Sequence, residues 1–279
     1  MTIDLTSAAT FGVAGNFTGH LEQAGEASDF VNVKVAEANA PKAIFPTYIP
    51  SDSAHVPEHL KPFPWSATCI EYPANQDMLQ LEPECAVVFD AAWEGTKLVA
   101  LRAIGFGASN DCSIRREGAK KISLKKNWGA NSKGFSDNIL PVDSFDSNGV
   151  INDYRIASFL VRDGVAYAYG EDSRICDYSY VYDKLIDWML DKFNNQADEG
   201  PAEDIHSYLV EAGCPDRILV SIGATRYTKY GETNFLKKGD HSVVVLYPES
   251  KYSFDDVVKM IESGSASASD ISVLDQVIM

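Results

Sequence analysis

The sequence predicts an α+β fold in which β-sheet dominates and helices are inserted between strands. From Cys85 onward, short apolar runs bounded by Gly, Pro or Asp recur, which is typical of buried strands. They lie at residues 85–89, 97–104, 218–222 and 242–247. Helical segments interrupt these runs without alternating regularly with them, and the sequence shows no internal repeat. A regularly alternating α/β fold is therefore disfavoured.

Three helices are expected. Residues 178–195 carry apolar side chains at helical spacing, and a shorter helix is predicted for residues 202–212. The third helix should begin after Ser253, because Asp256 three residues later completes a capping box, and it should end at Gly264.

Three segments are expected along the chain: residues 1–75 with a histidine motif and a Pro-rich stretch, residues 76–262 as the catalytic core, and residues 263–279 as a tail. Seven prolines at positions 40–75 argue against long helices or central strands there. The aromatic residues of this stretch favour an ordered excursion packed on the core, with a flexible linker as the alternative. In the tail, the small polar residues 265–269 predict disorder, apart from a possible docking of residues 273–279 on the fold.

Composition and charge narrow the classes of function. The 279 residues are 45% apolar, which is enough to bury a core without disulfide staples. The net charge of −16 and the isoelectric point near 4.6 disfavour nucleic acid and anionic membranes as partners. Five scattered cysteines without a CxxC pair indicate a reducing, cytoplasmic setting. We expect no leader peptide, and no membrane-spanning stretch of about 18 apolar residues.

Three acidic residues form a candidate metal site. Glu82 and Glu84 lead into an apolar strand, and side chains two apart in an extended chain point to the same face. Asp111 ends a Gly-rich segment after the next strand, which we expect to be a turn that presents side chains. Clustered carboxylates raise one another's pKa unless a cation lies between them. Oxygen ligands alone favour Mg²⁺, Mn²⁺ or Ca²⁺; the alternative is a solvated strand end.

Several segments, in the same order, resemble the motifs of the fumarylacetoacetate hydrolase superfamily. The resemblance extends over residues 11–247 and rests on the segments GVAGNFTGH (12–20), LEPECAVVF (81–89), GFGASNDCSIR (105–115), WGANSKGF (128–135), the strand at 218–223 and FLKKGD (235–240). It implies a mixed β-roll fold, usually a homodimer, and cleavage of carbon–carbon bonds in small keto or diketo acids bound through Mg²⁺.

The resemblance also implies roles for individual residues. Glu82, Glu84 and Asp111 would be the metal ligands, and His20 would be the general acid or base. Lys133 would face the substrate's carboxylate or a developing oxyanion. Without the resemblance, His20 would more simply be a packed or surface histidine. Lys133 would then be an ordinary solvated lysine.

Arg115 is a further candidate for binding the substrate. The alternatives are a structural ion pair at Arg115, or the same role for the adjacent Arg116.

The sequence departs from the family pattern beside the histidine. Gln23 stands where a glutamate is usual, three residues after His20, and Glu22 and Glu26 flank it. Glu22 is retained as the catalytic candidate, although on a helix it would point roughly 160° away from His20. The usual pair of histidine and glutamate that activates water is therefore in doubt.

Two further departures affect substrate binding. Ala224 replaces a threonine of the family, unless Thr225 takes its place, and Gly118 lies near the position of a usual glutamine. Arg226 and Tyr227, in the polar loop that follows, could form a replacement wall for an anionic substrate or could be exposed loop residues.

Taken together, the sequence predicts a metal-dependent hydrolase or lyase that cleaves a carbon–carbon bond in a small anionic keto acid. A keto–enol isomerase or tautomerase is an alternative, because that reaction needs a metal and a proton shuttle but no activated water. A non-catalytic descendant that binds a metabolite is the other alternative.

Overall fold

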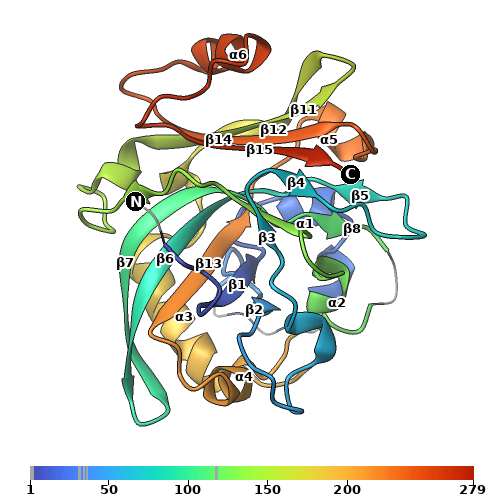
Figure 1. Ribbon diagram of the computed structural model, residues 1–279. Helices are drawn as coiled ribbons and strands as arrows, with labels where there is room; N and C mark the ends of the chain where they lie inside the picture. The colour runs from blue at the N-terminus through green and yellow to red at the C-terminus, as the bar shows by residue number, and fades with distance from the viewer. Residues whose placement is uncertain (1–2, 31–32, 34, 36, 117–118) are drawn as a thin grey trace.

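The computed structural model describes residues 3–30, 33, 35, 37–116 and 119–279, and its folded core consists of two β-sheets (Figure 1). The first sheet has the strand order β2-β1-β13-β6-β7-β9-β3, with β10 paired to β7. Its strands are β1 (Ala9–Ala14), β2 (Ala43–Tyr48), β3 (Trp65–Ser66), β6 (Pro83–Glu94), β7 (Lys97–Asn110), β9 (Lys133–Phe135), β10 (Leu140–Pro141) and β13 (Arg217–Ala224). It mixes parallel and antiparallel pairs, because β1 runs parallel to β13 and antiparallel to β2.

The second sheet has the order β12-β11-β14-β15-β4 and lies across one end of the first (Figure 1). Its strands are β4 (Cys69–Ile70), β11 (Tyr154–Arg162), β12 (Val165–Arg174), β14 (His241–Pro248) and β15 (Ser272–Ile278), and a separate short ribbon pairs β5 (Leu79–Gln80) with β8 (Ser113–Ile114). The docking predicted for the tail is confirmed, because β15 inserts between β14 and β4.

The helices are short and lie between strands, as the sequence predicts. They are α1 (His20–Gln23), α2 (Ser123–Lys126), α3 (Tyr182–Asn195), α4 (Ile205–Glu211), α5 (Lys229–Thr233) and α6 (Phe254–Glu262), with 3-10 turns η1 (Ala27–Phe30), η2 (Glu58–Leu60), η3 (Val150–Asp153) and η4 (Ile175–Asp177). The capping box of Ser253 and Asp256 is confirmed at the start of α6. In the part of the chain that is described, the helices are too short or too polar to pass through a bilayer.

The helix expected from residue 202 begins at Ile205, because the side chain of Asp204 caps it there. Two further predicted boundaries are wrong because of long-range contacts. The helix expected from residue 178 begins at Tyr182, since the backbone N–H of Tyr180 donates to the side chain of Asn16. The segment after residue 104 is not a turn, because β7 continues to Asn110 in register with β6. Gly107 allows this strand to lie close to its neighbours: a Cβ there would approach the ring of Phe135 at 3.1 Å.

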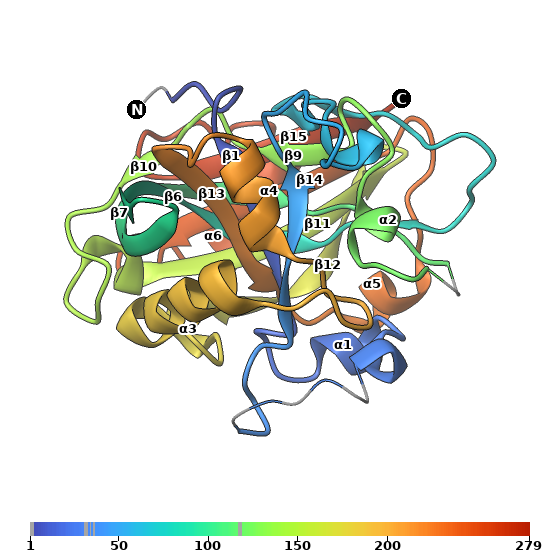
Figure 2. The same ribbon diagram turned by 90° about the horizontal axis from the view of Figure 1, so that it is seen from below.

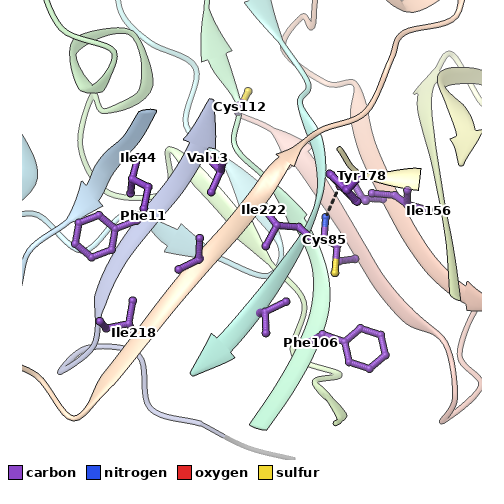
Figure 3. Packing of buried hydrophobic residues seen from close by; sticks show 14 of the residues in the cluster. Phe11, Val13, Ile44, Cys85, Phe106, Cys112, Ile156, Tyr178, Ile218 and Ile222 are labelled. Atoms are coloured by element: carbon purple, nitrogen blue, oxygen red, sulfur yellow. Dashed lines mark hydrogen bonds between the residues drawn. The ribbon is translucent and has the colours of Figure 1, made fainter. Parts of the chain in front are cut away.

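The Pro-rich excursion is ordered and packed on the core, as expected, and does not form a flexible linker. It contributes β2 at the edge of the first sheet, where a proline costs no ladder hydrogen bond to a further strand. Ile44 of β2 and Phe11 of β1 pack in the main apolar cluster (Figure 3). The N-terminal segment is therefore part of the packed core of the protein.

Candidate metal centre

The three acidic residues of the predicted metal site come together where β6 and β7 pair. Glu84 lies in β6 opposite Ser109 of β7, Glu82 precedes β6, and Asp111 follows β7. One carboxylate oxygen from each lies within 4.8 Å of the others. Glu82 and Glu84 are each 2% exposed and Asp111 is 0% exposed, so the cluster is buried and is not a solvated strand end.

Backbone and side-chain hydrogen bonds hold these residues in position. The N–H of Asp111 donates to the carbonyl of Glu82 over 3.1 Å, and the N–H of Glu82 donates to the side chain of Asn110 over 3.2 Å. Asn110 in turn donates to Gln276 of β15 over 3.1 Å. The second sheet therefore fixes the geometry of a site whose carboxylates come from the first.

Three buried cations surround two of the carboxylates. Lys126 contacts Glu82 and lies 2.8 Å from Asp111, whereas Lys133 lies 2.9 Å from Asp111. Arg115 lies 2.6 Å from Glu82. Burial acts to raise the pKa of Glu82, but Lys126 and Arg115 outweigh it and hold that pKa well below its usual range. Glu82 is therefore ionised.

Glu84 has a different environment. Its Oε2 accepts a hydrogen bond of 2.9 Å from the backbone N–H of Gly223, and among the described residues no cation lies within ion-pair distance of it. Burial and the charges of Asp111 and Glu82 raise its pKa well above the ordinary value. Both oxygens of Asp111 also lack a partner in hydrogen-bond geometry. Three buried carboxylates, of which Glu84 has no ion pair among the described residues, offer the oxygen donors that a hard divalent cation prefers.

His20, the first residue of α1, is buried beside the cluster. Its Nδ1 lies 2.8 Å from the carbonyl oxygen of Thr225, so Nδ1 carries the hydrogen and the neutral ring has a free lone pair on Nε2. Burial lowers the pKa of His20. The ring centroid lies 5.1 Å from that of Tyr227. A neutral, oriented imidazole can accept a proton.

The loop after β13 brings two of the predicted binding residues to the site and leaves one outside. Thr225 is buried, and the Tyr227 hydroxyl accepts a hydrogen bond of 2.9 Å from Arg115. Arg226 is exposed and pairs with Glu171 over 3.3 Å, so its side chain lies away from the cluster. Ala224 is buried at the end of β13, and Gly118 lies outside the described residues.

Glu22, the predicted catalytic partner of His20, is exposed on α1. The nearby buried carboxylate is Glu26, which pairs with Arg115 over 2.8 Å and with Lys125 over 3.4 Å. Gln23 is bound to the backbone of Tyr227. The geometry therefore supports neither Glu22 nor Gln23 as a water-activating partner of the histidine.

Lys126 is the residue that sequence reasoning missed. The segment 120–126 holds four lysines, and no local pattern distinguishes the one that becomes buried. α2 decides this: it directs Lys126 to the carboxylates and Lys125 to Glu26 and Asp29.

In both views α1, α2 and α5 gather at the same side of the molecule (Figure 1, Figure 2).

Known structures share this fold. A crystal structure of Cg1458 with inhibitor is 14% identical, with a TM-score of 0.57 over 98% of this chain and 77% of that chain. The 2-keto-3-deoxy-D-arabinonate dehydratase complexed with magnesium and 2,5-dioxopentanoate is 15% identical, with a TM-score of 0.54 over 97% and 72%. The 5-carboxymethyl-2-hydroxymuconate delta-isomerase from Mycobacterium smegmatis is 14% identical, with a TM-score of 0.52 over 98% and 78%.

These likenesses show the fold alone, and they confirm the predicted mixed β-roll of the fumarylacetoacetate hydrolase type. No curated protein is significantly similar to the chain in sequence. A family model matches residues 26–278, which are most of the chain. The chain therefore belongs to the family of unknown function DUF5718.

Proposed function

We propose that this protein is a divalent-metal-dependent enzyme that acts on a small anionic keto or diketo acid. The observation that carries the proposal is the convergence of Glu82, Glu84 and Asp111 in a buried site, where no ion pair with Glu84 is found among the described residues. Mg²⁺ is the first candidate, with Mn²⁺ and Ca²⁺ as alternatives, because all the donors are carboxylate oxygens. When bound, such an ion acts as a Lewis acid toward a substrate's keto oxygen.

The chain's own residues supply proton transfer and positive charge. The free Nε2 of His20 is suited to take a proton from the carbon next to a keto group. Lys133 donates to the carbonyl of Cys112 over 2.7 Å and contacts Asp111, which leaves one of its three hydrogens for an anionic substrate. Lys133 thus meets the requirement for local positive charge in an acidic chain.

Arg115 is better suited to holding the site together than to binding substrate. Its donors are taken by Gln80, Glu26 and Tyr227, in addition to Glu82. The geometry therefore supports the structural ion pair that the sequence left as an alternative. Arg116 is exposed and donates to the carbonyl of Leu124.

Cleavage of a carbon–carbon bond by hydrolysis or lysis is the first reaction to test. The likeness to a dehydratase complexed with magnesium and a dioxo acid supports the substrate class. An isomerase or tautomerase is the second candidate. It is supported by one observation in particular: His20 is hydrogen-bonded to a backbone carbonyl and not to a carboxylate. An isomerase needs a histidine that moves a proton, but it does not need the pair of histidine and carboxylate that activates water.

The test begins with calorimetric titration of Mg²⁺ and Mn²⁺ into chelator-treated protein. We expect binding by the wild type and a large loss in Glu84→Gln, which removes a ligand without leaving a cation unpaired. Absence of binding by the wild type would refute the proposal. Glu22→Gln is the matched control and should bind as the wild type does, because Glu22 is exposed.

Turnover separates the candidate reactions. Cleavage of acyl pyruvates or oxaloacetate with Mg²⁺ would support the lyase or hydrolase. Exchange of solvent deuterium into a keto acid without cleavage would support the isomerase. Metal binding with neither activity would favour a non-catalytic descendant.

A further inference from the structure

Lys126 has no part in the chemistry proposed above, yet it lies inside the carboxylate cluster. Its Nζ contacts Oε2 of Glu82 and lies 2.8 Å from Oδ2 of Asp111. The side chain comes from α2, outside both main sheets, and only 4% of it is exposed. A buried ammonium group therefore bridges two of the three groups proposed to bind the metal.

Lys126 differs in this from the other two cations. Among the described ion pairs, Arg115 contacts only Glu82 of the cluster, and Lys133 contacts only Asp111. Both are also held from outside the cluster, Arg115 by Glu26 and Tyr227, and Lys133 by the carbonyl of Cys112. Lys126 is the cation that lies between the carboxylates, and its described ion pairs are made with the cluster alone.

An ammonium group and a divalent ion cannot share this position. Both are attracted to the carboxylates of Glu82 and Asp111, and in a buried site of low dielectric their mutual repulsion is barely screened. A lysine can withdraw, because its charge is carried on a flexible four-carbon stem. The ring of Phe45, 5.3 Å from Nζ, offers a cation–π contact on one side of the group.

We propose that Lys126 is an internal counter-ion that occupies the position of the metal in the metal-free protein and is displaced when a divalent cation binds. This inference rests on the proposed metal site. Lys126 then has two effects: it keeps the buried carboxylates paired without metal, and it weakens metal binding because the ion must displace it. The metal affinity of this protein is set partly by a lysine that is not a ligand.

The test is titration of Mn²⁺ into chelator-treated Lys126→Met, which keeps an unbranched side chain one atom shorter and removes its charge. We expect Mn²⁺ to bind at least about tenfold more tightly than to the wild type, because no ammonium opposes it. Without metal, the melting temperature of the variant should fall, since two buried carboxylates lose a partner. Saturating Mn²⁺ should then raise it more than it raises that of the wild type.

Two further variants make the result decisive. Lys126→Gln provides a second neutral side chain, with amide donors for the carboxylates, and should also bind Mn²⁺ more tightly. Lys125→Met is the matched control, because Lys125 lies in the same helix but pairs with Glu26 and Asp29. Its affinity for Mn²⁺ should equal that of the wild type.

The outcomes separate this inference from the proposed function. Equal or weaker Mn²⁺ binding by both Lys126 variants, with binding by the wild type intact, overturns the inference and leaves the metal site standing. Tighter binding in Lys125→Met as well would also overturn it, because a general gain of negative charge would then explain the effect. Absence of Mn²⁺ binding in every protein overturns both proposals.

Discussion

At the scale of single residues, Gln23 shows how one side chain changes what a motif can do. Its amide donates to the carbonyl of Tyr227 over 3.1 Å and to Glu232 over 2.8 Å, and its oxygen accepts from the N–H of Tyr227 over 2.8 Å. These bonds tie α1, which carries His20, to the loop after β13. The position where the resemblance implies a glutamate is thus structural in this chain.

Replacing Gln23 by glutamate should therefore destabilise the protein. The carboxylate would lose both donations and would face the carbonyl of Tyr227 and the carboxylate of Glu232, for a cost of about 1–3 kcal/mol. Urea unfolding would measure this cost. The double variant Gln23→Glu, Glu232→Gln should recover part of it, because the repulsion is removed. A single variant as stable as the wild type would show that these contacts contribute nothing.

A second prediction at this scale concerns His20. Its replacement by glutamine should leave the dissociation constant for Mg²⁺ within about threefold of the wild-type value, because His20 is not a proposed metal ligand. Any turnover or deuterium exchange should fall at least about 100-fold, the usual contribution of a general base. Calorimetry and product assays on one preparation would measure both. Loss of metal binding would contradict the assigned role.

At the scale of elements, α2 is held at its first residue by a chain of hydrogen bonds. Ser123 donates to Glu203 over 3.1 Å and lies 2.9 Å from Nε2 of His59. Burial raises the pKa of Glu203 from 4.5 to about 7, and its second oxygen has no partner in hydrogen-bond geometry among the described residues. The helix that carries Lys126 is thus anchored by a group that titrates near neutral pH.

This anchor predicts a dependence of stability on pH. Between the unfolded value of 4.5 and the folded value of about 7, the folded chain retains a proton at Glu203 that the unfolded chain has released. This contribution to stability is present below pH 4.5 and is lost as pH rises through that window, by about 3 kcal/mol at most.

Glu203→Gln should flatten this part of the curve. Urea midpoints of the variant and the wild type at several pH values between 4.5 and 8 would check it, with His59 present in both proteins. Because burial lowers the pKa of His59, that group contributes a change of the opposite sign, and the comparison isolates Glu203. Parallel curves would contradict the prediction.

At the scale of the whole molecule, the close contact of the two sheets fixes the site. Gly134 of β9, next to Lys133, faces β15: a Cβ there would lie 2.2 Å from the side-chain oxygen of Gln276 and 2.6 Å from Leu274. Gln276 also accepts from Asn110, which holds Glu82. Separation of the sheets would therefore disturb the carboxylate cluster.

Gly134→Ala should force this separation. We expect a loss of about 1–3 kcal/mol in the free energy of unfolding, the usual cost of adding an atom to a well-packed core. Mn²⁺ affinity should fall with it, because Gln276 positions Asn110. Guanidinium unfolding and calorimetry would measure the two effects. A variant with unchanged stability would show that the sheets have room to adjust.

The homodimer implied by the resemblance stays a prediction at this scale, as does the cytoplasmic setting. Sedimentation equilibrium would test the former, since the chain mass is 30.5 kDa and a dimer doubles it.

The sequence by itself determined the local features of this protein. Apolar runs predicted the centres of β6, β13 and β14, and the Ser253 capping box predicted the start of α6, because both depend on neighbours within a few residues. It also predicted that the carboxylates of Glu82, Glu84 and Asp111 come together, as they do, whereas their role as metal ligands stays a prediction.

Only the tertiary structure decided what depends on distant contacts. The start of α3, the continuation of β7 and the isolation of Glu84 from any described cation follow from pairings across the sheets. So does the choice of Lys126 over its neighbours. Burial and charge compensation are properties of the whole assembled fold, and no window of sequence contains them.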